Sequence, residues 1–334
     1  MNDARGATPF RPVPGEPVRW SEDFGTRFTM FVDVEEEFDW TAPLDRAHRA
    51  TTAMAAFPAA HRRFAERGVG LTCMIDHPIA TDPGSVDLLR TVAGDGRSAI
   101  GAQLHPWVTP PHDEPVNGFT SFSGNLPRAL QAAKIATLTT AIADAFGAPP
   151  QAFRAGRYGL GPDTLALLAA AGYRLDSSVR PGYDYSGEGG PDYARAGNAA
   201  WHANGLVELP LTTIFTGRAR LGGGGLHQAL GRIPKARGLF ARAGLLSRVA
   251  LTPEDMPVRA ALDAVELAVG EGIRLLTFSF HSPSLAPGHT PYVRDAADLK
   301  AFWRWWDAVL DRLDRLGVRP ASLAQILAAA EAGS

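Results

Sequence analysis

The chain has 334 residues, of which 45% are hydrophobic and 20% are charged, and its formal net charge is -2. This composition is enough for a real core in one large domain or two ordinary ones, and the charge gives no reason to expect nucleic acid as a partner. The single cysteine, Cys73, excludes an internal disulfide, and its apolar surroundings predict an inert core residue. We expect a cytoplasmic protein, because the sequence shows neither a secretion signal nor the roughly 18 consecutive apolar residues of a membrane span.

Short apolar runs that are typical of strands alternate with helical patterns. The strand candidates are 27–34, 70–76, 98–105, 151–156, 173–179, 205–211 and 273–281. The helix candidates are 53–68, 85–94, 126–147, 161–172, 258–272, 296–317 and 321–333. This alternation favours parallel strands covered by helices. No Gly-rich phosphate fingerprint follows the first strand, so we predict an α/β fold of the (β/α) barrel type, closed or nearly closed, with about seven strands rather than two Rossmann halves.

The predicted organisation is an N-terminal arm over residues 1–26 and a barrel over 27–330, which an irregular basic insertion interrupts at about 212–253. Between Glu208 and Glu254 there is no acid. The basic residues of this stretch are Arg218, Arg220, Arg232, Lys235, Arg237, Arg242 and Arg248. The insertion could recognise phosphate on a nucleotide sugar, or a lipid-linked sugar at a membrane surface, or it could be a solvated basic loop.

Five carboxylates crowd into the stretch FVDVEEEFDW, residues 31–40, where the first strand ends. Asp33, Glu35 and Glu37 share a face if the strand continues. Carboxylates this close repel unless a cation or an arginine lies among them, or one takes a proton. Asp33 follows the apolar run directly and is the candidate base, whereas we expect Glu36, Glu37 and Asp39 to face solvent in a loop.

Other predicted strands also end in polar side chains, and in a (β/α) barrel these ends form the active site. His281 ends an apolar strand and suits the role of proton donor. Arg154, flanked by small residues, could pair with Asp33, and Asp176 could hold the imidazole of His281. His105 ends another strand on the same face as Gln103 and is a candidate metal ligand.

The set of strand ends resembles the five motifs of the NodB-homology polysaccharide deacetylases, taken in order: the acidic first strand, a Gln/His third strand, FRAGRYG, LDSSV and FSFHSPS. The segments GAQLHPWVTPP, RAGRYG and SFHSPSLAPGHTPYVRD look most like the WalW-like branch of that family, and the resemblance covers about residues 25–330. It implies a distorted (β/α) barrel that removes acyl groups, usually acetyl, from amino sugars. By position it makes Asp33 the base, Arg154 its partner, Asp176 the carboxylate that tunes the acid, and His281 the general acid.

The expected metal site departs from the family pattern. The family places a metal-binding aspartate directly after the base, where this chain has Val34, so Glu35 is the candidate replacement. The family also supplies two histidines four residues apart, and either alignment leaves only His105 here. Glu35, His105 and Asp33 could still hold Zn²⁺ or another divalent ion, and a metal-free site stays open.

The sequence therefore predicts a hydrolase that removes an N-acyl group from an amino sugar of a glycan or glycan precursor. The aromatic residues Trp40, Trp107 and Tyr158 suit sugar stacking near the mouth of the barrel. Gln103 is a further candidate for binding the substrate. Two alternatives remain: a C–N hydrolase for a small amide or ureide, and a non-catalytic carbohydrate-binding protein.

Overall fold

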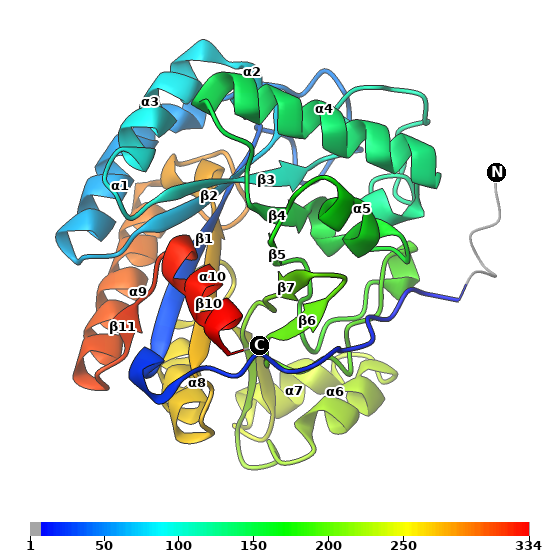
Figure 1. Cartoon of the computed structure of the whole chain (residues 1–334). Coiled ribbons are helices and arrows are strands. Elements are labelled where there is room, and N and C mark those ends of the chain that lie inside the picture. Colours follow the sequence, from blue (N-terminus) through cyan, green and yellow to red (C-terminus); the bar gives the residue numbers. More distant parts are fainter. Residues whose placement is uncertain (1–7, 334) are drawn as a thin grey trace.

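The computed structural model describes residues 8–333 and contains a curled, half-barrel sheet (Figure 1). Its strands follow the order β10-β1-β2-β3-β4-β5-β7-β6, and β11 pairs with β1 outside this path. All pairings are parallel except that of the edge strand β6 with β7. The strands are β1 Arg27–Val34, β2 Leu71–Ile75, β3 Ala99–Leu104, β4 Ala152–Ala155, β5 Leu175–Asp176, β6 Trp201–Ala203, β7 Leu206–Glu208, β10 Leu275–His281 and β11 Arg319–Pro320. The predicted distorted (β/α) barrel is confirmed.

Helices cover the outer face of the sheet, as the alternation in the sequence predicts. They are α1 Phe57–Glu66, α2 His77–Thr81, α3 Pro83–Ala93, α4 Arg128–Phe146, α5 Thr164–Ala170, α8 Val258–Gly270, α9 Ala296–Arg315 and α10 Leu323–Ala332. Local signals set several of their ends. Gly147 ends α4 with φ 79°, a left-handed conformation that glycine adopts without strain, and Asp295 caps the first turn of α9.

Side chains of β1 alternate between two separate cores. Phe28, Met30 and Val32 point outward and pack under the helices. Phe31 points into the barrel, where it joins apolar residues of other strands and of α10. Thus α10 closes the barrel at the end opposite the carboxyl ends of the strands, and the polar residues gather at the open end.

The gap between β7 and β10 is closed without a regular strand. The backbone N–H groups of Leu209 and Leu211 donate to the carbonyls of Asp176 and Val179 on one side. On the other side, Thr212 bonds with Thr277, and the N–H of Ser279 donates to the carbonyl of Leu251. The two ends of the insertion therefore complete the barrel wall beside β10.

The insertion itself is ordered, and the expectation of an irregular segment is wrong. It comprises an antiparallel ribbon of β8 Thr213–Thr216 and β9 Ser247–Ala250, which carries the helices α6 Gly223–Gly231 and α7 Ala236–Arg242. Figure 1 shows α6 and α7 at the edge of the molecule opposite α2 and α4.

The predicted arm is described from residue 8 onward, since residues 1–7 lie outside the described residues. Its backbone pairs with the edge strand β6 through an isolated bridge between Pro17 and Trp201. Val18 and Phe24 bury their side chains in the core that α10 closes. Among the described residues, no helix is long and apolar enough to cross a membrane.

Candidate active site

A cavity of about 700 Å³ opens at the carboxyl ends of the strands. Its walls come from β1, β3, β4 and β10, from the loop after β5, and from the segment that follows β9. Nine of the ten predicted site residues line it: Asp33, Glu35, Trp40, Gln103, His105, Trp107, Arg154, Tyr158 and His281. The tenth, Asp176, does not.

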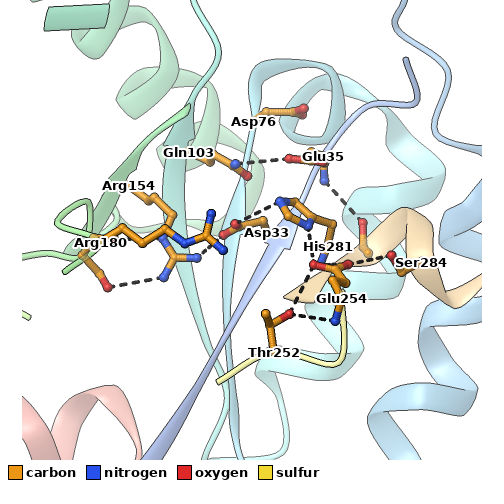
Figure 2. A network of polar contacts seen from close by, with 12 residues as sticks. Asp33, Glu35, Asp76, Gln103, Arg154, Arg180, Thr252, Glu254, His281 and Ser284 are labelled. Atoms are coloured by element: carbon orange, nitrogen blue, oxygen red, sulfur yellow. Dashed lines mark hydrogen bonds and ion pairs between the residues drawn. The ribbon is translucent and has the colours of Figure 1, made fainter. Parts of the chain in front are cut away.

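Asp33 of β1 and Arg154 of β4 form the buried ion pair that the sequence predicts. The guanidinium of Arg154 is fixed from behind, because its Nε donates to the carbonyl of Ser177 at 2.9 Å and it lies over the ring of Phe31. The second carboxylate oxygen of Asp33 lies 3.7 Å from Nε2 of His281 (Figure 2). Arg154 thus orients a carboxylate that faces the imidazole.

Glu254, rather than Asp176, holds His281. Nδ1 of His281 lies 2.7 Å from Oε2 of Glu254, and the backbone N–H of His281 donates to Oε1 at 3.0 Å (Figure 2). Ser284 donates to the same carboxylate at 2.6 Å. Burial opposes the charge on the imidazole, but Glu254, Glu35 and Asp33 outweigh it and raise the pKa of His281 to about 10. His281 therefore carries its proton throughout the neutral range.

Asp176 is fully buried behind Arg154, and its contact with His281 was wrongly predicted. Its carboxylate accepts from the hydroxyl of Ser178 at 2.7 Å and from the backbone N–H of Ser178 at 3.0 Å. Ser178 in turn accepts the backbone N–H of Ala155, beside Arg154. Burial raises the pKa of both Asp176 and the adjacent Glu208. Asp176 therefore supports the strand that carries Arg154 and does not contact His281.

Glu35, Gln103 and His105 form a second polar group on the cavity wall. Oε2 of Glu35 accepts from the amide of Gln103 at 3.2 Å and lies 3.6 Å from Nε2 of His105. Oε1 of Glu35 and Oε1 of Gln103 are both buried without a hydrogen-bond partner. Burial, partly offset by His281 and His105, raises the pKa of Glu35 to about 7. Two orphaned oxygens beside an imidazole nitrogen fit a divalent cation.

Glu36 supports this group from behind, and the expectation that it faces solvent is wrong. Its side chain is completely buried, with one oxygen 2.8 Å from Nδ1 of His105 and the other accepting Nε1–H of Trp107 at 2.8 Å. Burial raises the pKa of Glu36 to about 8. Glu36, Asp76 and His105 also place ligand atoms within 4.8 Å of one another. However, Asp76 caps α2 through Ile79 and accepts the N–H of Glu36, so its oxygens are already engaged. A carboxylate on Nδ1 is the usual partner of a histidine that ligates through Nε2.

The predicted aromatic residues take different positions around the mouth. Trp40 is half-buried and turns its edge to His281, with ring centroids 5.2 Å apart. Tyr158 stacks on Tyr185 and is half-buried. Trp107 is only 2% exposed and stacks on His105, so its ring mainly holds that imidazole in place.

Several residues of the site were not predicted: Glu254, Arg180, Tyr183 and Tyr185. Arg248 was expected only as one of the basic residues of the insertion. A signal existed for Glu254, since it follows the apolar run of β9 as acids follow β1. Arg180 likewise lies four residues beyond Asp176, at a strand end. For the tyrosines no local pattern distinguishes them from loop residues.

Comparison with known proteins gives a fold but no sequence match. No family model and no curated protein matches this chain. A candidate polysaccharide deacetylase from Mycobacterium smegmatis superimposes with a TM-score of 0.51 and 17% identity over 96% of this chain and 95% of that one. The chain shares the (β/α) barrel fold of that candidate deacetylase.

Two further structures show weaker likeness. A GH57 branching enzyme from Thermococcus kodakaraensis has a TM-score of 0.49 and 12% identity over 91% of this chain and 71% of that one. A CE4 family pseudoenzyme from Bacillus anthracis has a TM-score of 0.46 and 7% identity over 95% and 70%.

Proposed function

We propose that this protein is a carbohydrate N-deacetylase, which hydrolyses an N-acyl group, usually acetyl, on an amino sugar. The observation that carries the proposal is the arrangement of Asp33, held by Arg154, 3.7 Å from the protonated imidazole of His281. A carboxylate and an imidazolium that face each other in a cavity supply the base and the acid that amide hydrolysis requires. The deacetylase-type fold agrees with this chemistry.

Asp33 and His281 can accept and donate the protons that the hydrolysis moves. Asp33 takes a proton from water while the water oxygen bonds to the acyl carbon, and Arg154 keeps the carboxylate aimed at that water. As the C–N bond breaks, Nε2 of His281 gives its proton to the departing nitrogen. Glu254 stabilises the imidazolium before this transfer and fixes the ring on Nδ1. The products are a carboxylic acid and a free amino sugar.

A divalent cation, for example Zn²⁺, fits beside this pair, with Glu35, His105 and Gln103 as its holders. Asp33, the third ligand expected from the sequence, pairs with Arg154 and faces His281, and the orphaned oxygen of Gln103 takes its place as a ligand. When bound, such an ion would polarise the acyl carbonyl. Trp40 and Tyr158 offer aromatic faces for the sugar ring.

We also propose that the substrate is a phosphate-linked or lipid-linked sugar precursor and that the protein is cytoplasmic. The basic insertion would make a peripheral contact with the membrane. Support for phosphate and membrane contact comes from basic residues of the insertion such as Arg232 and Lys235, and from its exposed apolar side chains Leu221, Ile233 and Leu239.

The test is release of acetate from N-acetylated amino sugars by the purified protein, compared with Asp33→Asn and His281→Ala. We expect each substitution to lower kcat/KM by about 100- to 10,000-fold, the usual contribution of a general acid or base. Asp23→Asn, on the exposed arm away from the cavity, is the matched control. Circular dichroism must show that all variants fold.

The same assay separates the alternatives. Equal rates in the wild-type protein, Asp33→Asn and His281→Ala would refute the assignment. Faster turnover of a ureide than of any acyl sugar would favour the C–N hydrolase. Glycan binding without turnover, whatever divalent ion is added, would favour a binding protein.

A further inference from the structure

Two arginines on the cavity wall have no acidic partner. Arg154 and Arg157 also line the cavity, but they pair with Asp33 and Glu188. Arg180, after β5, and Arg248, on β9, make no ion pair with any residue that the structure describes. Figure 2 shows the side chain of Arg180 extending toward the Asp33–Arg154 pair. These two cations therefore belong to the same cavity as the reacting groups.

Aromatic rings, rather than carboxylates, hold the two guanidinium groups in place. The central carbon of Arg248 lies 3.4 Å from the ring centroid of Tyr183, and that of Arg180 lies 4.0 Å from the same centroid. Arg180 donates to the hydroxyl of Tyr185 at 3.2 Å, and Arg248 donates to the carbonyl of Gly182 at 2.7 Å. A guanidinium has five N–H donors, so most of them remain for a ligand. Nε of Arg180 is buried with no hydrogen-bond partner.

The charges of this wall are not balanced. Burial, and more weakly the positive charge of Arg180, lower the pKa of Arg248, although Tyr183 opposes this. Of the nearby acids, Asp33 is engaged by Arg154 and Glu254 by His281. Asp255 lies within electrostatic reach of Arg180, yet forms no ion pair with it. Two like charges on a half-buried wall without a counterion are expected where an anion binds.

We propose that Arg180 and Arg248 bind an oxyanion carried by the substrate, either a phosphate or a carboxylate, while Tyr183 supports both guanidinium groups. The inference rests on the proposed function and adds to it that the amino sugar is an anionic one. Arg248 belongs to β9 of the insertion and also lines a neighbouring hollow with Arg232 and Arg237, where Asp184, Glu188 and Asp192 lie as well. The anionic group therefore lies on the side of the sugar that faces the insertion.

Calorimetric binding of free amino sugars tests the inference, because these compounds carry no acyl group and are not turned over. The probes are glucosamine, glucosamine 1-phosphate and muramic acid. The first carries no anionic group, the second carries a phosphate, and the third carries a carboxylate. We expect at least one anionic probe to bind about 10- to 100-fold more tightly than glucosamine, the range of charge-assisted hydrogen bonds. Whichever anionic probe binds more tightly identifies the anion.

Variants assign the preference to the two arginines. Arg248→Gln and Arg180→Gln should each reduce the anionic preference by about 10-fold or more, whereas Arg304→Gln, on the exposed face of α9, should retain it. Equal binding of all three probes, or a preference that survives both substitutions in folded protein, would overturn the inference. A preference that depends on the arginines in a protein that deacylates no sugar would retain the anion site and refute the proposed reaction.

Discussion

Single residues of the acidic stretch after β1 take three different roles. Asp33 pairs with Arg154, Glu35 faces the cavity beside two orphaned oxygens, and Glu36 is buried against His105 and Trp107. Strand alternation predicts the shared face of Asp33 and Glu35. It does not predict the burial of Glu36, because His105 and Trp107 reach that carboxylate from a segment about 70 residues away in the sequence.

At the residue scale, Glu254→Gln should narrow the pH range of activity. The negative charge of Glu254 is the largest of the effects that raise the pKa of His281 to about 10, so the acid form lasts until the pH rises through about 10. Without that charge the alkaline limb of the kcat/KM profile should move to lower pH. The stability that the protonated imidazole contributes, present below its unfolded pKa and lost as pH rises through about 10, should also decrease. Glu266→Gln, on the surface of α8, is the control, and an unchanged profile in Glu254→Gln would contradict the role of Glu254.

Metal retention should depend on pH through Glu35. The pKa of Glu35 is raised to about 7, so protons compete with a cation for its oxygens below that pH. Protein purified without chelator should hold about one divalent ion per chain above about pH 8 and lose it as pH falls.

Glu36→Gln should weaken metal retention by about 10- to 100-fold, since it removes the charge behind His105. Mass-spectrometric metal analysis measures this, with exposed Asp39→Asn as control. Protein free of metal at every pH would contradict the site.

At the scale of elements, the insertion contributes directly to the cavity. The ribbon of β8 and β9 begins and ends beside β10, and the chain that leaves it carries Glu254 to His281. Composition alone suggested an irregular basic segment, because α6 begins in a glycine run and α7 has only 7 residues. Pairing of β8 with β9 is a long-range contact, which local patterns cannot reveal.

The segment 106–116, which carries Trp107, depends on one lysine of α4. Lys134 is fully buried, donates to the carbonyls of Pro106, Thr109 and Pro111, and lies 3.0 Å from Glu114. Lys134→Met should lower the free energy of unfolding by about 3–5 kcal/mol, because it leaves Glu114 and these carbonyls without their partner. Urea denaturation measures the loss. Lys300→Met, exposed on α9, should cost little, and equal stability of the two variants would contradict this account.

Across the described part of the molecule, three of the seven exposed large apolar side chains lie in the insertion. Leu221, Ile233 and Leu239 are 86%, 58% and 65% exposed, among basic residues with no acid between Glu208 and Glu254. Exposed apolar side chains among basic ones are typical of segments that bind anionic membranes.

Replacing two of these side chains should therefore weaken membrane binding. We expect Leu221→Ser with Leu239→Ser to reduce sedimentation with phosphatidylserine vesicles by about 10-fold or more, since each buried leucine contributes roughly 1.5–3 kcal/mol. Salt should also reduce binding. Leu316→Ser, at the end of α9, is the control. Vesicle binding that persists in the double variant would exclude this surface.

The sequence by itself determined the alternation of strands and helices, the ends of most of them, and the pairing candidates Asp33, Arg154 and His281. These features depend on local periodicity and on the rule that polar residues meet at the carboxyl ends of parallel strands. Only the tertiary structure decided that Glu254 rather than Asp176 holds His281, that Glu36 is buried, and that Arg180 and Arg248 share Tyr183. Each of these contacts joins segments whose approach depends on how the sheet curls and where the insertion packs, and no local pattern encodes either.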